Sequence, residues 1–221
     1  MKKMNKYQNS VLIMGTILAI LALAVILFPH RNVSLATPTK TATTKVVKKR
    51  KDIAEKNPNL PYPDPKDLQP AGSWKVKSEN KAHPDLLSLS KLWIRVSIKG
   101  NRVYIMDGKK PVYTMLASCG VYHHGKSATP TGTYAVEAEK GASFFNQSLQ
   151  VGARTYVSWH GHGTYLFHSV PIDGDNKIMK NEAKKLGRTQ ASHGCIRLSL
   201  PDSKWLYEKL PVGTKVVVKD K

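Results

Sequence analysis

The chain has 221 residues, of which 41% are hydrophobic and 23% are charged, so we expect most of it to fold around a sizeable core. Its two cysteines are too few for a small domain held together by disulfides, which excludes that class. Lys and Arg number 35 against 15 Asp and Glu, and the formal net charge of +20 favours an anionic partner such as nucleic acid, acidic lipid headgroups or an anionic cell-wall polymer.

The N-terminal segment, residues 1–28, joins a basic start to an apolar run. Val11–Phe28 is 18 residues long without a charge, close to the lower limit for a helix that spans a bilayer. The lysines before it predict a cytoplasmic N-terminus with the remainder translocated. A cleaved signal peptide, which would give a secreted protein, is the alternative, because Ser34–Ala36 resembles a cleavage site. The length of the run favours an uncleaved anchor. Both alternatives place the folded part outside the cytoplasm, which argues against nucleic acid.

Residues 29–70 are predicted to form an extended, solvated stalk. They are basic and rich in Pro, and they show no apolar periodicity. Leu60–Pro70 holds four prolines in eleven residues, too many for a helix or a central strand. Residues 71–91 are weakly patterned, and we interpret them as a lead-in to a compact domain at residues 92–221.

Short strands separated by turns dominate residues 92–221. Ile94, Val96 and Ile98 alternate with polar residues, which is the period of two of a half-buried strand. Asp107-Gly108 is a strong hairpin dipeptide. Further strands are expected at residues 102–106, 111–118, 133–138, 156–159, 164–170 and 214–219. The pattern predicts a mainly β domain, either a sandwich or a barrel.

Two helical patches interrupt these strands. In residues 176–187, apolar residues share one face and Gly187 fits the stop position. In residues 201–211, Pro201 suits the first turn and Pro211 ends the pattern. The domain is therefore expected to carry one or two short helices.

Cys195, in the stretch TQASHGCIRLS, is the first candidate for chemistry. The thiolate is the reactive form of cysteine, and a nearby imidazole can take the thiol proton. His168 ranks first as this base because it ends an apolar run inside a predicted strand, which would hold the ring rigidly. His193 is too near in sequence to point squarely at the sulfur. His160 and His162 lie in a glycine-broken turn, where their placement is looser.

Backbone and side-chain donors lie beside this cysteine. An N–H group at Gly194 or Cys195 could donate to the oxygen of an attacked carbonyl. Arg197 offers a planar cation that suits a carboxylate of the substrate or of the protein itself.

Other interpretations of these residues stay open. A disulfide between Cys119 and Cys195 would block a nucleophilic role, although a packed, unreactive thiol is the simpler expectation for Cys119. The turn at Thr129–Gly132 is expected to have a structural role beside the cleft. No zinc pattern that we can name matches the spacing of the candidate metal ligands, so we expect no metal and no cofactor. Those ligands are His160, His162, His168, His193 and Cys195.

The motifs SHGCIRL, HS in GTYLFHSV, and TPTGTY together resemble the catalytic domain of the L,D-transpeptidases, also called the YkuD family. These are bacterial enzymes that cross-link peptidoglycan, and the resemblance spans about residues 92–219. It implies a β-rich, sandwich-like fold with Cys195 as the nucleophile and His168 as the general base. It also implies that the Ser169 carbonyl orients the imidazole and that the amides of Gly194 and Cys195 form an oxyanion hole.

Three further residues stand at the family's motif positions and are assigned to substrate binding: Ser192, His193 and Arg197. The implied reaction is a two-step acyl transfer, in which the cysteine attacks the carbonyl of the third residue of a tetrapeptide stem and D-Ala leaves. The thioester then passes to an amine of a neighbouring stem. With water as the acceptor the same site would be an L,D-carboxypeptidase, and a non-catalytic wall-binding module is the remaining alternative.

The connection between the proposed base and the motif departs from the resemblance. Between His168 and Ser192 lie 23 residues, more than the family's common spacing. Residues 176–187 fill the excess and are predicted to act as a partly mobile lid. The triplet His162-Gly163-Thr164 imitates the surroundings of the base in many relatives, which makes His162 a lower-ranked rival.

Overall fold

The structure is a computed structural model that describes residues 57–221. The predicted anchor and the first part of the predicted stalk, residues 1–56, lie outside the described residues. Within residues 57–221, no helix is both long enough and apolar enough to cross a membrane.

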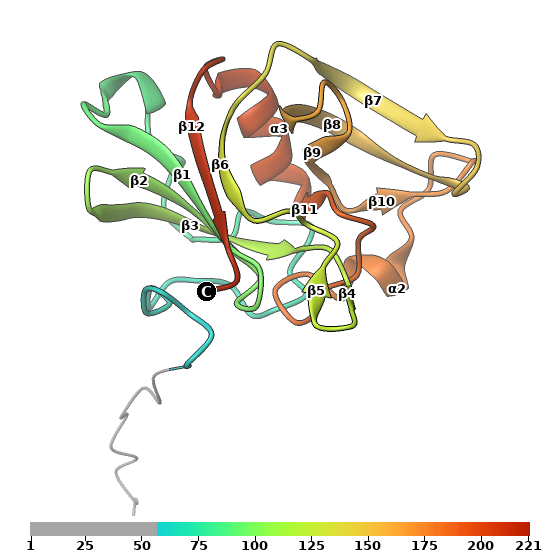
Figure 1. Ribbon diagram of the computed structural model, residues 1–221, viewed down its shortest axis with the longest axis horizontal. Helices are drawn as coiled ribbons and strands as arrows, with labels where there is room; N and C mark the ends of the chain where they lie inside the picture. Colours follow the sequence, from blue (N-terminus) through green and yellow to red (C-terminus); the bar gives the residue numbers. More distant parts are fainter. Residues whose placement is uncertain (1–56) are drawn as a thin grey trace, which may run out of the picture. The chain divides into compact units, whose positions relative to one another are not determined.

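One curled sheet of ten strands forms the body of the domain (Figure 1). Its strand order is β10-β8-β9-β11-β3-β2-β1-β12-β6, with β7 paired to β8, while β4 and β5 form a separate two-stranded sheet. In chain order the strands are β1 (Leu92–Ser97), β2 (Arg102–Asp107), β3 (Lys110–Ser118), β4 (Tyr122–His123), β5 (Lys126–Ser127), β6 (Gly132–Ala135), β7 (Lys140–Asn146), β8 (Val151–His160), β9 (Tyr165–Ser169), β10 (Pro171–Ile172), β11 (Ile196–Leu198) and β12 (Lys215–Lys219).

The sheet curls so far that the segment following its edge strand β6 is hydrogen-bonded to β8. Beyond β6, the Glu137 N–H donates to the Ser158 carbonyl of β8 at 2.9 Å, and the Ser158 N–H donates to the Glu139 carbonyl at 2.8 Å. The prediction of a mainly β domain is confirmed, and the strands form one half-barrel instead of the two facing sheets of a sandwich. The core lies inside the curl and includes Ile94, Ile105, Met115, Trp159 and Phe167.

The helix predicted at residues 201–211 is α3 (Leu200–Lys209), which contacts β8 and β9 inside the curl (Figure 1). Its N-terminus is capped by Ser199, whose hydroxyl oxygen accepts the Asp202 N–H at 3.2 Å. Leu206 is fully buried against the sheet. This helix therefore fixes the inner face of the strands that carry the site described below.

The second predicted helix, in residues 176–187, is much shorter than its pattern indicates. Only α2 (Lys180–Ala183) is helical, followed by turns that end at Gly187, where φ is +71°. Ala183 and Leu186 are fully buried beside Leu116. The helical patch is confirmed in position but reduced to a single turn, because its apolar side chains pack on the domain without a longer helix.

The remaining short helix, η1 (Leu86–Ser88), lies in the segment before β1. That segment belongs to the folded domain. Residues 57–70, predicted to be a solvated stalk, instead lie against the sheet: Leu60 is 7% exposed, and Asp64 pairs with Arg102 of β2 through contacts of 2.8 and 2.9 Å. Ser97 of β1 is one of the polar residues that alternate with Ile94, Val96 and Ile98, and it is buried under this segment, where its hydroxyl donates to the Asn59 carbonyl at 3.0 Å. The solvated-stalk prediction is therefore corrected for residues 57–70.

The predicted lead-in, residues 71–91, is tied to α3 by a buried carboxylate. Asp202 is fully buried and accepts hydrogen bonds from the Ser78 hydroxyl at 2.5 Å and the Tyr113 hydroxyl at 3.1 Å, and its Oδ1 lies 2.8 Å from His83 Nε2. The His83 ring also stacks on Trp205, with ring centroids 4.4 Å apart. A buried carboxylate needs such partners to offset its desolvation, so this segment is part of the domain's stabilising structure.

Candidate active site

Two neighbouring parallel strands bring the predicted nucleophile and base to one face of the sheet. In β9 and β11, Ile196 lies opposite Phe167 and Arg197 lies opposite His168. Ile196 and Phe167 are buried in the core. Because successive side chains of a strand point to opposite faces, Cys195, His168 and Arg197 project together to the other face.

These three side chains line one pocket of about 350 Å³. Its walls include Phe144, Leu149 and Tyr156 from the β7–β8 hairpin and its loop. The sequence predicted part of β8 at residues 156–159 but did not predict β7. Tyr165 lines the pocket from β9, and His193 from the turn before β11. No Asp or Glu of the described chain is among the lining residues. The pocket is therefore apolar on the hairpin side and cationic beside the sulfur.

Cys195 is a free thiol at this pocket. Its Sγ donates to the Thr164 carbonyl at 3.6 Å and makes no hydrogen bond to His168. Burial raises the pKa of the thiol, although the Leu166 N–H and the Arg197 charge act in the opposite direction. The resting form is therefore the thiol. Cys119 is also free, lies in the core and has a pKa raised to about 12 by burial, which confirms a packed thiol and rules out the disulfide alternative.

The His168 imidazole is held in one tautomer by its neighbour. Its Nδ1 lies 2.6 Å from the Ser169 carbonyl oxygen. A carbonyl can only accept, so Nδ1 carries the hydrogen and Nε2 keeps its lone pair. His168 is 5% exposed, and burial, assisted by the positive charge of Arg197, lowers its pKa to about 3. The ring is therefore a neutral acceptor, and Phe144 packs against it edge-on with centroids 5.4 Å apart.

The Ser169 carbonyl is free for this contact because the β8 ladder is interrupted beside it. β8 pairs with β9 as far as Tyr156 opposite His168, and pairing resumes in the same register at Ala153 opposite Pro171 of β10. Between them Thr155 has a φ of +51°, a strained conformation for a β-branched residue. The Arg154 N–H donates to the Ser169 hydroxyl at 2.9 Å, so the carbonyl remains for the imidazole.

The turn from Ser192 to Cys195 is shaped by a buried hydroxyl. The Ser192 hydroxyl donates to the Cys195 carbonyl at 2.5 Å and accepts the Gly194 N–H at 3.1 Å. Ser192 is 3% exposed, so its main contacts are with the turn, although it borders the pocket. Of the two amides predicted for an oxyanion hole, that of Gly194 is already bonded, whereas that of Cys195 makes no hydrogen bond within residues 57–221.

Arg197 forms an ion pair with a residue of the segment predicted to be a lid, residues 176–187. Its Nη1 donates to Glu182 Oε2 at 2.8 Å, and Lys185 lies 2.5 Å from the other oxygen. Arg197 is 5% exposed, and its Nε has no partner within the described chain. Glu182, which the sequence did not single out, thus supplies the counter-ion. Residues 176–187 do not line the pocket and are docked through buried side chains, so the structure does not support a lid.

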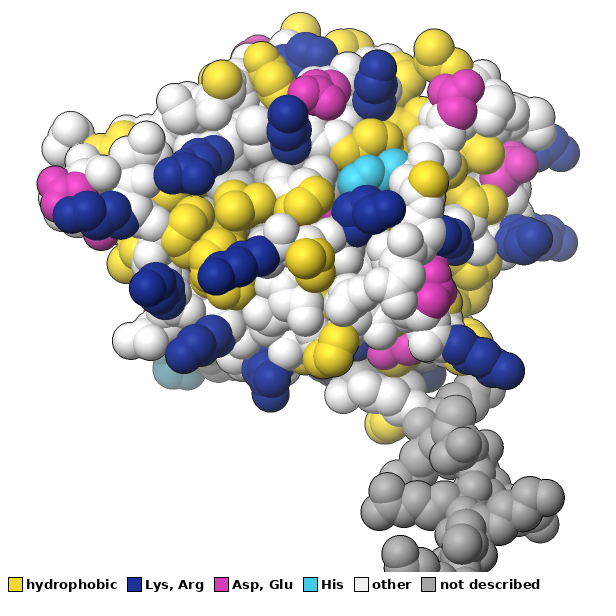
Figure 2. All heavy atoms as spheres, turned by 180° about the vertical axis from the view of Figure 1, so that it is seen from behind, with side chains coloured by type: hydrophobic (Ala, Val, Ile, Leu, Met, Phe, Trp, Pro, Cys, Tyr) yellow, Lys and Arg dark blue, Asp and Glu magenta, His cyan; other side chains and the backbone are white. Residues whose placement is uncertain are grey.

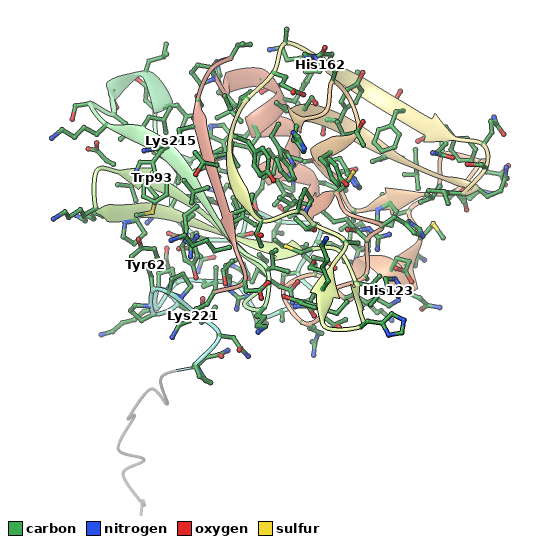
Figure 3. The ribbon with its side chains drawn as sticks, in the orientation of Figure 1. Tyr62, Trp93, His123, His162, Lys215 and Lys221 are labelled. Carbon is green, nitrogen blue, oxygen red and sulfur yellow. The ribbon has the colours of Figure 1, made fainter. Side chains whose placement is uncertain are left out.

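The rival histidines lie elsewhere. His162 is at the periphery of the domain (Figure 3); its side chain is 81% exposed, and its Nδ1 is 2.9 Å from Glu139 Oε1, which raises its pKa. His160 stacks between Tyr134 and Tyr165. Neither residue lines the pocket with His168, His193 and Cys195. The five candidate metal ligands are therefore not all brought to one place: three line the pocket and two lie outside it. The one group of three potential metal ligands among the described residues is a different set, outside the pocket: Glu137, Glu139 and His162.

Comparisons with known proteins place this chain in a family. Residues 91–218 match the model of the L,D-transpeptidase catalytic domain, YkuD. The chain is 48% identical over 143 residues to YciB of Bacillus subtilis (strain 168), whose name gives the L,D-transpeptidase assignment as provisional; the match covers 65% of this chain and 73% of YciB.

Solved structures are also similar over part of the chain. One is a fused Zn-dependent amidase/peptidase/peptidoglycan-binding domain-containing protein from Clostridium acetobutylicum ATCC 824, at 30% identity and a TM-score of 0.43, covering 58% of this chain and 52% of that one. Another is an L,D-transpeptidase from Mycobacterium smegmatis, at 21% identity and a TM-score of 0.47, covering 58% of each chain. The chain thus spans little more than half the length of these two proteins. On the match of the catalytic-domain model, the chain belongs to the L,D-transpeptidase (YkuD) family.

Proposed function

We propose that this protein is a peptidoglycan L,D-transpeptidase that works through a thioester on Cys195. The observation that carries the proposal is the arrangement of Cys195 and His168 in one pocket. The neutral imidazole donates from Nδ1 to the Ser169 carbonyl and keeps Nε2 as a proton acceptor. A thiol and an oriented neutral imidazole on adjacent strands form the pair that nucleophilic acyl transfer requires.

The first step is acylation by a tetrapeptide stem. The thiol of Cys195 gives its proton to Nε2 of His168 while the sulfur forms a bond to the carbonyl carbon of the third stem residue. The carbonyl electron pair moves to oxygen, where the N–H of Cys195 is the available donor. When the tetrahedral adduct collapses, the bond to the D-Ala nitrogen breaks and that nitrogen takes the proton from the imidazole.

The second step releases the acyl group to an amine of a neighbouring stem. The amine forms a bond to the thioester carbon, its proton passes to His168, and the departing sulfur is protonated again. Water in place of the amine gives carboxypeptidase activity. No metal or cofactor takes part in either step as proposed.

Two residues are proposed to hold the substrate. Arg197 lines the pocket, and its guanidinium charge suits a carboxylate or carbonyl oxygen of the stem. His193 is exposed at the pocket rim and is positioned to contact the stem peptide. Ser192 is better explained as a residue that shapes the turn, because its hydroxyl is used by Gly194 and Cys195.

The proposed setting is the bacterial cell surface, with residues 1–28 as a single-pass anchor and the catalytic domain outside. Lys and Arg side chains are spread over the face shown in Figure 2, with fewer Asp and Glu among them. This distribution suits a wall that contains anionic polymer, to which the positively charged surface of the domain would be attracted.

Product analysis tests the proposal. Incubation with a disaccharide-tetrapeptide should yield free D-Ala together with a cross-linked dimer, both absent with Cys195→Ala. Tripeptide without dimer, at any acceptor concentration, would instead identify an L,D-carboxypeptidase. Binding to peptidoglycan with neither product would identify a non-catalytic wall-binding module.

A further inference from the structure

Thr129 is a buried residue of the TPTG turn that the chemistry above leaves unexplained. It is 1% exposed, and its hydroxyl makes two hydrogen bonds: the oxygen accepts the Gly120 N–H at 2.7 Å, and the O–H donates to the Gly194 carbonyl at 2.8 Å. Its own N–H donates to the Ser127 hydroxyl at 3.1 Å. The Thr129 side chain is therefore fixed and points at the turn that carries the nucleophile.

Gly194 lies directly against this segment. Its φ is +141°, a conformation that favours glycine. A Cβ at this position would lie 2.9 Å from the Ala128 carbonyl oxygen and 2.8 Å from a ring carbon of Tyr165. The backbone of the turn can therefore approach Thr129 closely only because residue 194 has no side chain.

This contact decides which way the next amide points. The carbonyl of Gly194 and the N–H of Cys195 belong to one planar trans peptide, so they point in opposite directions. With the carbonyl held by Thr129, the Cys195 N–H is turned away from Thr129. It makes no hydrogen bond elsewhere in residues 57–221. On its far side the turn is closed by the Ser192 hydroxyl, which donates to the Cys195 carbonyl.

We propose that Thr129 is the positioning residue of the oxyanion hole: its hydroxyl locks the Gly194–Cys195 peptide so that the Cys195 N–H faces the oxygen of the attacked carbonyl. The proposal rests on the acyl transfer proposed above. In that step the sulfur bonds to the carbonyl carbon, and the electron pair that moves to oxygen is stabilised by this N–H. Without the lock the peptide can rotate, and the donor is lost when charge develops on the oxygen.

Thr129→Val is the test variant because it keeps the shape of threonine and removes the hydroxyl. Thr129→Ser restores the hydroxyl, and Thr131→Val makes the same change at an exposed threonine of the same turn. Two reactions of Cys195 are compared at one pH: acylation by a disaccharide-tetrapeptide and alkylation by iodoacetamide. Alkylation displaces iodide at a saturated carbon and develops no oxyanion, so it reports only on the thiol.

For Thr129→Val we expect acylation to be about 10- to 100-fold slower with alkylation unchanged within about twofold, since loss of one oxyanion donor typically has an effect of this order or larger. Thr129→Ser should be acylated within about threefold of the wild-type rate. The control Thr131→Val should be acylated at the wild-type rate. Equal slowing of acylation and alkylation would overturn the proposal, because it would mean that the thiol itself is displaced. An unchanged acylation rate would also overturn it.

The Cys195 amide signal in a ¹H–¹⁵N NMR spectrum gives a readout that needs no substrate. It should shift or broaden in Thr129→Val and return in Thr129→Ser. If wild-type protein is not acylated while this signal responds as expected, the proposed function is wrong, but the Thr129 hydroxyl still orients the Gly194–Cys195 peptide. A signal that does not respond to the substitution would contradict that orienting role itself. Should Thr129→Val not fold, Thr129→Ala takes its place in the same comparisons.

Discussion

At the scale of single residues, burial sets the resting state of the pair at the centre of the site. Burial raises the pKa of the Cys195 thiol and lowers that of His168 to about 3, so both groups are neutral at pH 7. The sulfur rests against the Thr164 carbonyl, not against the imidazole. A thiolate–imidazolium pair is therefore not formed in advance. In the proposed reaction, proton transfer would therefore accompany attack on the substrate, and a fixed tautomer of His168 would keep Nε2 available for the proton.

The depressed pKa of His168 has a consequence for stability. The unfolded chain binds a proton at histidine near pH 6.5, whereas the folded protein does so only near pH 3. Between these values the unfolded state binds more protons, so stability should fall as the pH drops through this window and should be unaffected above it. Urea unfolding at pH 7.5, 5.5 and 4.5 should show this loss. His168→Gln should show a smaller loss, and an identical loss would contradict a buried neutral ring.

At the scale of elements, the segment at residues 176–187 supports the site from outside the pocket. The sequence predicted a mobile cover here. In the structure, Ala183 and Leu186 are fully buried and Glu182 pairs with Arg197. A covering role belongs more naturally to the β7–β8 hairpin, which contributes Phe144 and Tyr156 to the pocket wall. The long connection between His168 and Ser192 thus supplies packing and a counter-ion.

Hydrogen exchange distinguishes a docked segment from a lid. The amides of Ala183 and Leu186 donate to the carbonyls of Met179 and Ala183 at 2.9 and 3.2 Å, under buried side chains. They should exchange as slowly as amides of neighbouring strands, both in free protein and after acylation. Fast exchange of these amides in the free protein that slows on acylation would instead support a lid at residues 176–187.

Glu182→Gln tests the buried ion pair against a matched surface pair. Arg197 would lose its charged partner while its side chain stays 6% exposed, so stability should fall by about 1–3 kcal/mol. In Glu208→Gln the partner is Lys204 at 3.6 Å, with both side chains well exposed, and the change should stay below about 0.5 kcal/mol. Denaturant unfolding measures both. Equal, small changes would show that Glu182 contributes little to the fold.

At the scale of the whole described chain, the folded unit begins well before the sheet. Residues 57–90 bury Leu60 and Leu86, pair Asp64 with Arg102, and supply Ser78 and His83 to Asp202. This segment covers the outer face of β1 and ties it to the helix behind the site. We therefore expect the fold that supports the site around Cys195 to need residues 57–90, a segment in which the sequence shows no recognisable motif.

Two fragments test this dependence. A fragment of residues 57–221 should fold, whereas one of residues 92–221 leaves Asp202 without Ser78 and His83 and should be less stable by about 3–5 kcal/mol or fail to fold. Thermal unfolding of the two measures the difference. Equal melting temperatures would show that the preceding segment is dispensable.

Local patterns in the sequence predict much of this structure. The alternation at Ile94, Val96 and Ile98, the Asp107-Gly108 turn and the helix at residues 200–209 all have short-range signals, and each is found in the structure. The motif and the predicted strand pointed to Cys195 and His168, and the structure places both in one pocket. Long-range contacts had no such signal. The pairing of Glu182 with Arg197 and the packing of residues 57–90 depend on which distant groups the fold brings together.

In the site, too, the sequence predicted the features with short-range signals and missed the contacts that depend on the fold. SHGCIR names the nucleophile, but nothing in it indicates that the Gly194 amide is bonded to Ser192 or that Thr129 reaches the Gly194 carbonyl. β7 was missed because KGASFFN alternates weakly, and β11 because three residues give no period.

The central claim, a thioester on Cys195, is tested most directly by intact-protein mass spectrometry after incubation with a disaccharide-tetrapeptide. We predict one adduct with the mass of the donor less D-Ala, located on Cys195 by peptide mapping. The adduct should persist in Cys119→Ala, because Cys119 is buried with a pKa near 12, and should vanish in Cys195→Ala. An adduct that survives Cys195→Ala, or turnover of the donor by that variant, would contradict the account.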